Sequence, residues 1–95
     1  MKKSLQIKWI KALRDGKYKQ CRENMVENGK YCCLGVLAKT CKVNLRHVNR
    51  EGELSDNFLK EIGMTHKQQV EFIQMNDDQE MDFKEIADRV SSVLK

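Results

Sequence analysis

The chain has 95 residues, of which 40% are hydrophobic and 34% are charged, and its formal net charge at pH 7 is +4. This balance excludes a disordered chain, and the length predicts a single domain over residues 1–95. No run of about 18 apolar residues occurs, which excludes a membrane-spanning helix. Lysines and arginines interrupt the apolar residues near the N-terminus, so no secretion signal is expected and the protein is predicted to be cytoplasmic.

The residues before Gly16 have the pattern of an amphipathic helix that ends at this glycine. Apolar side chains share one broad face, and basic side chains share the other with one isoleucine among them. The apolar face consists of Leu5, Trp9, Ile10, Ala12 and Leu13, and the basic face consists of Lys3, Ile7, Lys8, Lys11 and Arg14.

Asn28-Gly29 lies within a segment that mixes polar and apolar residues and predicts the turn of a two-stranded hairpin. A type I′ turn needs positive φ at both central positions, which Asn and Gly tolerate best. In that register Cys32 lies opposite Met25, and Cys21 meets neither Cys32 nor Cys33.

A helical period returns from Cys33 to Cys41, with Gly35 on the face expected to be exposed. Residues 42–53 are ambiguous, and a third short strand at 43–50 or a loop is compatible with them. Three more helices follow, and their predicted N-caps are Ser55, Thr65 with Gln68, and Asp82 with Glu85. The sequence therefore predicts an α+β fold, a mainly helical single domain with about five helices and one small β-hairpin.

The four cysteines are predicted to be free thiols that pack in the interior. Cys33 and Cys41 are eight residues apart on one predicted helix, or about 12 Å, which is too far for a disulfide. No Cys-x-x-Cys pair occurs, and His47 and His66 stand singly, so no metal site is expected. Leu and Val surround Cys33, which favours burial over the exposed, electropositive setting of a catalytic thiol.

No other motif indicates catalysis or a cofactor, and we assign no catalytic residue. Residues 76–87 begin like a calcium loop, but Met81 replaces the required glycine and Ala87 replaces the bidentate glutamate. Asp77 and Asp78 are ordinary turn residues in a segment that implies no raised carboxyl pKa. The sequence therefore predicts a protein that is not an enzyme.

Charge is distributed unevenly between the two halves of the chain. Residues 1–50 hold 13 Lys/Arg and 3 Asp/Glu, whereas residues 51–95 hold 5 Lys/Arg and 11 Asp/Glu. Such a split indicates either an anion-binding basic face or two halves that attract each other.

The basic charge is densest from Lys8 to Arg22, where Trp9 and Tyr18 lie between the cations. Aromatic rings can stack on bases while cations neutralise phosphate, so this segment is a candidate for binding a nucleotide or nucleic acid. Alternatively, the cations bind an acidic protein surface, or they form a solvated helix face with Trp9 in the core. The candidate partner- or anion-binding residues are Lys8, Lys11, Arg14, Lys17, Tyr18, Lys19 and Arg22.

Three sequence blocks together resemble a group of small proteins encoded in phage and prophage genomes. The first block matches at Trp9, Ala12, Leu13, Gly16, Lys17, Tyr18 and Gln20, the second at Tyr31 through Leu37, and the third at Asn76, Asp77, Phe83, Glu85, Ile86, Ala87 and Asp88. The chain departs from the pattern at Cys21, where a small residue often follows the glutamine.

The resemblance implies a phage accessory protein that acts in the cytoplasm of a bacterial host. Such proteins frequently bind and block a host factor or sequester a signalling nucleotide. We therefore expect a binding protein that inhibits or redirects a host protein, for example one with a role in defence. The alternative is a nucleotide- or nucleic-acid-binding module, and the sequence leaves homo-oligomerisation open.

Overall fold

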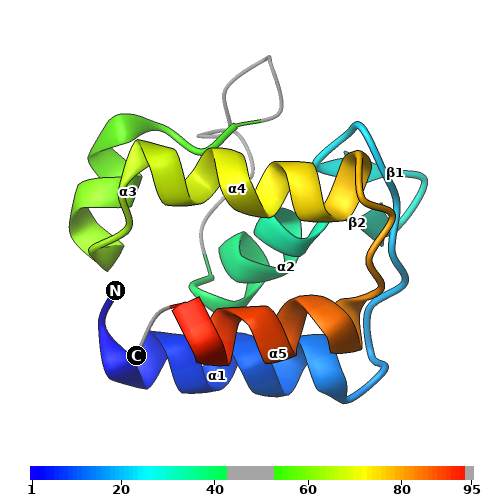
Figure 1. The fold of residues 1–95 in the computed structure, drawn as a ribbon, viewed down its shortest axis with the longest axis horizontal. Helices are drawn as coiled ribbons and strands as arrows, with labels where there is room; N and C mark the ends of the chain where they lie inside the picture. The colour runs from blue at the N-terminus through cyan, green and yellow to red at the C-terminus, as the bar shows by residue number, and fades with distance from the viewer. Residues whose placement is uncertain (43–52, 94–95) are drawn as a thin grey trace.

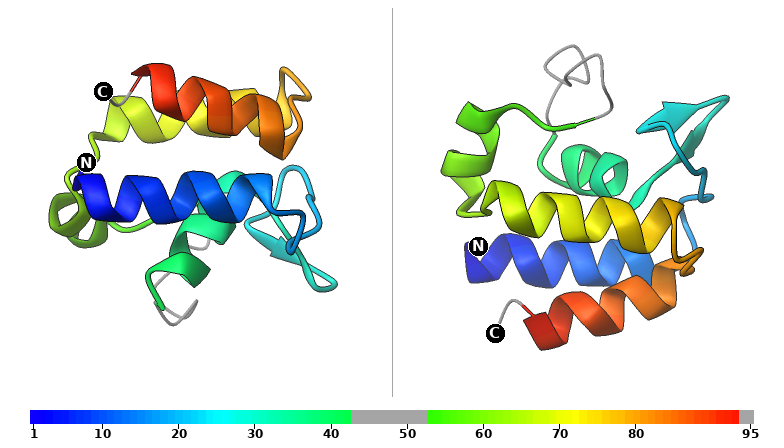
Figure 2. Two further views of the ribbon diagram at one scale, coloured as in Figure 1. Left: turned by 90° about the horizontal axis from the view of Figure 1, so that it is seen from below. Right: turned by 45° about the horizontal axis from the view of Figure 1, so that its top comes forward.

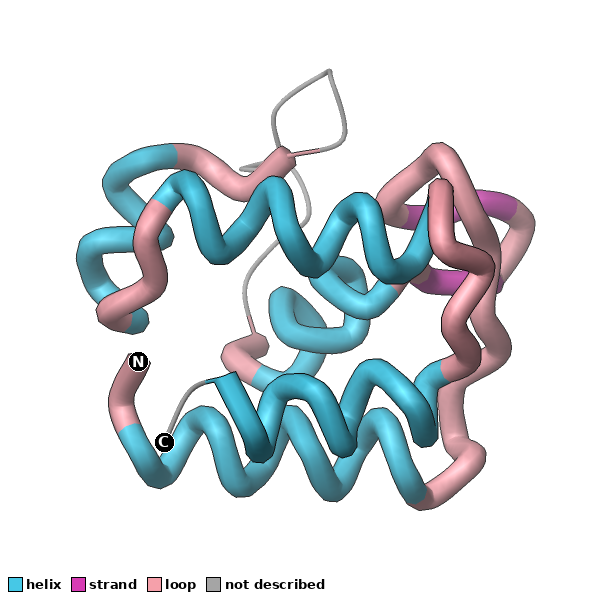
Figure 3. Tube along the Cα trace, viewed as in Figure 1, coloured by secondary structure: helices cyan, strands magenta, loops and turns pink. Residues whose placement is uncertain are grey.

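A computed structural model describes residues 1–42 and 53–93 of the chain, so the strand or loop expected at 43–50 lies outside the described residues. The described residues contain five helices and one antiparallel sheet of two strands, which confirms the predicted mainly helical α+β fold (Figures 1 and 3). The elements are α1 (Lys3–Arg14), β1 (Val26–Glu27), β2 (Lys30–Tyr31), α2 (Cys33–Thr40), α3 (Asp56–Ile62), α4 (His66–Asp77) and α5 (Phe83–Val93).

The helices form a layered arrangement around α1. Helices α1 and α5 lie side by side and run in opposite directions, and α4 packs against α5 (Figures 1 and 2). Helix α2 packs against both α1 and α4, and the hairpin lies at the end of the molecule where α1 finishes. As a result, the basic N-terminal helix has one side against the core and the other toward solvent.

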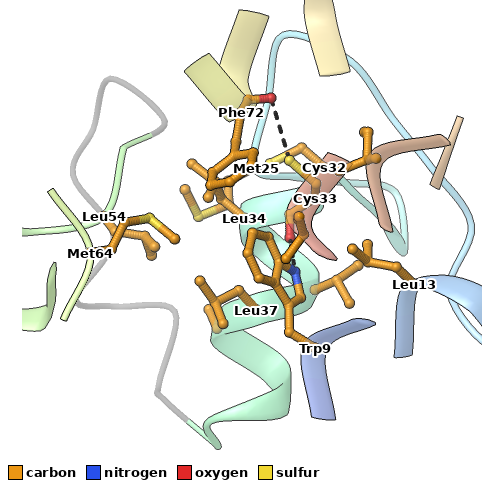
Figure 4. Packing of buried hydrophobic residues seen from close by; sticks show 14 of the residues in the cluster. Trp9, Leu13, Met25, Cys32, Cys33, Leu34, Leu37, Leu54, Met64 and Phe72 are labelled. Carbon is orange, nitrogen blue, oxygen red and sulfur yellow. Dashed lines mark hydrogen bonds between the residues drawn. The ribbon is translucent and has the colours of Figure 1, made fainter. Parts of the chain in front are cut away.

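Helix α1 has the amphipathic character that the sequence predicts, and its apolar face contains the largest core side chain. Trp9 has no exposed surface, and its indole Nε1 donates a hydrogen bond of 2.9 Å to the backbone oxygen of Cys33 (Figure 4). The Trp9 ring also meets Phe72 edge to face, with ring centroids 5.3 Å apart. Trp9 therefore joins α1 to α2 and α4.

The hairpin has the predicted turn and register. Val26 pairs with Tyr31, and the two turn residues both have positive φ, 50° at Asn28 and 78° at Gly29. The amide of Cys32 donates to the oxygen of Met25 at 3.0 Å, so these two residues lie opposite each other as expected.

Helix α2 differs from the prediction because it has no exposed face over its first six residues. Every residue from 33 to 38 is buried, including Gly35, which the sequence pattern placed on the exposed face. The hairpin covers this side, and a Cβ on Gly35 would collide with the backbone oxygen of Met25. Glycine is needed here because the hairpin backbone approaches the helix too closely for a side chain.

All three predicted N-caps are present. The hydroxyl of Ser55 accepts from the amide of Phe58, and Thr65 and Gln68 form a reciprocal capping box. Asp82 and Glu85 exchange the same pair of hydrogen bonds, at 2.8 and 3.3 Å. None of the described helices is long and apolar enough to cross a membrane.

Candidate functional site

The four thiols are free and mainly serve packing, as predicted. Cys33 is completely buried, and its Sγ lies 3.5 Å from the backbone oxygen of Phe72 (Figure 4). Cys32 has a second role that the sequence did not reveal, because it is the N-cap of α2. Its Sγ accepts a hydrogen bond of 3.4 Å from the amide of Gly35.

Burial makes these thiols poor nucleophiles. Desolvation raises the pKa of Cys32 from 9.0 to about 11 and raises the pKa of Cys33 well above 9.0. Only the thiolate attacks carbon or sulfur, so both thiols are overwhelmingly in the unreactive form at neutral pH. Within residues 1–42 and 53–93, no three His, Cys, Asp or Glu side chains are arranged to hold a metal ion.

A buried polar cluster lies where segment 20–23 meets the end of α4. The Asn76 side chain has no exposed surface, and its oxygen accepts from the Gln20 side chain at 2.8 Å and from the Cys33 amide at 3.2 Å. Its amide nitrogen donates to the Cys21 backbone oxygen at 2.9 Å and to Asp77 at 2.8 Å. Asn76 therefore holds together a loop, the start of α2 and the end of α4.

This cluster explains much of the three-block sequence pattern in structural terms. Gln20 comes from the first block, Cys33 from the second, and Asn76 and Asp77 from the third. Asp77 also accepts a hydrogen bond of 2.9 Å from the amide of Glu23. The cluster consists of mutually satisfied hydrogen bonds, which is the arrangement of a structural support.

The candidate binding residues on α1 lie on its solvent face. Lys8 and Lys11 are exposed and form no ion pair with any described residue. Arg14 is also exposed, but its guanidinium contacts the Asp88 carboxylate of α5 at 2.7 Å. Attraction between the basic and acidic halves, one of the two alternatives, is therefore present at Arg14, whereas Lys8 and Lys11 contact no carboxylate of residues 1–42 or 53–93.

The other four candidate residues follow α1, and Arg22 differs from the first three in being held by a backbone contact. The half-buried Tyr18 ring packs edge to face on Tyr31, and the ammonium of Lys17 lies 5.7 Å from the Tyr18 ring centroid. Lys19 is exposed. Arg22 is set apart because its guanidinium donates to the backbone oxygen of Glu80, so this cation helps to hold the turn between α4 and α5.

One apolar side chain is exposed in the middle of the cationic face of α1. Ile7 has 59% of its surface exposed, more than Val26 or Val93, the other large apolar side chains exposed among the described residues. It is one of the residues that line an open groove of about 520 Å³ between α1 and α5. The groove is lined by Ile7, Ile10, Lys11, Arg14, Asp15 and Ser91.

Together these features define a small, mainly helical domain with a cationic face on its first helix and an apolar groove beside that helix. The chain belongs to the family described as a domain of unknown function, DUF8296, whose model matches residues 1–57. The match contains α1, the hairpin and α2, and it ends within α3. Comparison with curated proteins and with solved structures gave no match.

Proposed function

We propose that the chain is a non-enzymatic phage accessory protein that binds a bacterial host protein through the cationic face of α1 and thereby inhibits or redirects it. Two observations support binding at this face. Lys8 and Lys11 have no carboxylate partner among the described residues, and Ile7 is exposed beside them. Ile7 and the half-buried Ile10 together give this face apolar surface that a partner can cover.

The state of the thiols supports a non-enzymatic role. A small thiol enzyme would need an accessible thiolate with a nearby base, whereas Cys32 and Cys33 are buried and have raised pKa values. The phage origin and the action in the host cytoplasm rest on the three-block resemblance.

The alternative function is binding of an anionic nucleotide or nucleic acid near Tyr18. A pocket of about 260 Å³ lies beside this ring, and Arg14, Gln20 and Lys84 contribute to its lining. A base would stack on what Tyr18 exposes and not on Trp9, which is completely buried. The buried Trp9 removes the better stacking surface and leaves protein binding as the favoured function.

The test is recovery of the tagged protein from bacterial cells that express it. Wild type is compared with a Lys8→Glu/Lys11→Glu variant and with a Lys39→Glu/Lys67→Glu variant, which changes net charge equally at exposed positions on α2 and α4. We expect a host protein to co-purify with wild type and with the control variant but not with the α1 variant.

Equal recovery by all three proteins would contradict a role for α1. Extraction of a nucleotide from the purified wild type, lost in the α1 variant and in about 0.5 M salt, would instead support the alternative.

A further inference from the structure

We propose that the groove between α1 and α5 is the docking site for an acidic amphipathic helix of the partner protein. This inference rests on the proposed function and specifies the chemistry of its partner.

The groove has the length and periodicity that an incoming helix requires. Four of its lining residues, Ile7, Ile10, Lys11 and Arg14, follow the i, i+3, i+4, i+7 spacing and therefore lie along one stripe of α1. The stripe extends for about 10 Å, or two helical turns, and Ser91 of α5 forms the opposite wall. In helix-in-groove recognition the incoming helix lays its own apolar anchors, spaced i, i+3, i+4 and i+7, along such a surface.

The charge around the groove specifies an acidic partner. Helix α1 carries Lys3, Lys8 and Lys11 and no acidic residue, and its fourth cation, Arg14, is paired with Asp88. The one carboxylate in the groove lining belongs to Asp15, and it accepts a hydrogen bond of 2.9 Å from the amide of Lys17. A partner helix with an apolar stripe flanked by glutamates would place its apolar side chains on Ile7 and its carboxylates near the lysines.

Two other occupants fit less well. A second copy of the chain would bring two cationic helices together, and such like-charge contact is destabilising. The phosphates of a nucleic acid would neutralise the lysines, but they would make no favourable contact with the aliphatic Ile7. The groove lining also contains no aromatic ring on which a base could stack.

The experiment measures fluorescence anisotropy with a labelled peptide of about 18 residues, five helical turns, that carries leucines on one stripe and glutamates beside them. A matched peptide has lysine at every glutamate position, and a single-stranded oligonucleotide is the third probe. The proteins are wild type, Ile7→Ser, Lys11→Glu and the control Val26→Ser, which removes an exposed apolar side chain from the hairpin.

We expect only the acidic peptide to bind tightly, and we expect Ile7→Ser and Lys11→Glu each to raise its Kd about tenfold or more. Val26→Ser should change this Kd by less than about twofold, because Val26 is in the hairpin and outside the groove lining. Ile7 is mostly exposed, so its replacement should leave the thermal unfolding curve unchanged.

Absence of peptide binding, equal binding of the lysine peptide, tighter binding of the oligonucleotide, or an unchanged Kd for Ile7→Ser would overturn the inference. A dimer in sedimentation that Ile7→Ser dissociates would assign the groove to a second copy and overturn it as well.

The cell-based recovery separates this inference from the function on which it rests. If Ile7→Ser keeps the host protein that Lys8→Glu/Lys11→Glu loses, the proposed function stands and helix docking fails. If the charge variant keeps the host protein, the proposed function itself fails.

Discussion

Replacing Asn76 by alanine should destabilise the fold more than any other single change in a polar side chain of α4. The change removes four hydrogen bonds from a side chain that has no exposed surface. Gln20 and Asp77 each keep another partner, the Met81 backbone oxygen and the Glu23 amide.

The amide of Cys33 and the backbone oxygen of Cys21 have no other hydrogen bond within the described residues, so the Asn76→Ala variant leaves two buried backbone groups unsatisfied. Each such group costs about 1–3 kcal/mol, which gives a loss of about 2–6 kcal/mol from a total of about 5–15 kcal/mol. The higher helix propensity of alanine offsets only about 0.5 kcal/mol of this loss.

Urea unfolding followed by circular dichroism measures the effect, with the exposed Gln74→Ala on the same helix as the control. We expect the midpoint to fall by about 1 M or more for Asn76→Ala and to stay nearly constant for the control. A loss below about 0.5 kcal/mol for Asn76→Ala would refute the view that this side chain holds α2, α4 and segment 20–23 together.

Cys32→Ser should leave the free energy of unfolding in urea unchanged, because serine is a preferred N-cap. Cys33→Ser should lower it by about 1–3 kcal/mol, because it buries a hydroxyl, and equal losses of free energy in the two variants would contradict the cap role of Cys32. Gly35→Ala should cost about 1–3 kcal/mol, since its Cβ must displace the Met25 backbone, and an unchanged urea midpoint would show that the hairpin yields freely. The free energy of unfolding should keep the full Cys32 contribution below pH 9.0 and decline toward pH 11, because the unfolded chain releases the Cys32 proton at a lower pH than the folded chain does. Unfolding curves that coincide across this range would contradict the raised pKa of Cys32, and so would a Cys32→Ser variant whose free energy of unfolding declines equally.

Local sequence signals were sufficient for most of the secondary structure. Asn28-Gly29 determines the hairpin register by its tolerance of positive φ, and Thr65 with Gln68 begins α4 through a reciprocal cap. Trp9 was correctly placed on the apolar face of α1. These features depend on residues that are close in sequence, so periodicity and capping rules find them.

Features created by tertiary contact were missed. Gln69 and Asn76 are completely buried, although more apolar residues of α4 were the expected core residues. Their burial depends on hydrogen-bond partners from other segments, Leu54 for Gln69 and both Gln20 and Cys21 for Asn76. The presence of Asn76 in the three-block pattern was the one signal that could have revealed its role.

The candidate binding surface was predicted in part. The helical periodicity correctly placed Lys8 and Lys11 on an exposed face, but it could not show that Arg14 contacts Asp88 or that Arg22 holds the Glu80 turn. The exposure of Ile7 was also not singled out, because its significance depends on the groove that α5 completes.

Site-specific photo-crosslinking in bacterial cells tests most directly whether α1 is the working surface. A photoreactive amino acid replaces Ile7 in one protein and the exposed Lys67 of α4 in another, and crosslinked products are identified by mass spectrometry. We predict one dominant host protein crosslinked from position 7 and none from position 67. The same products from both positions, or a product from position 67 alone, would contradict binding through α1.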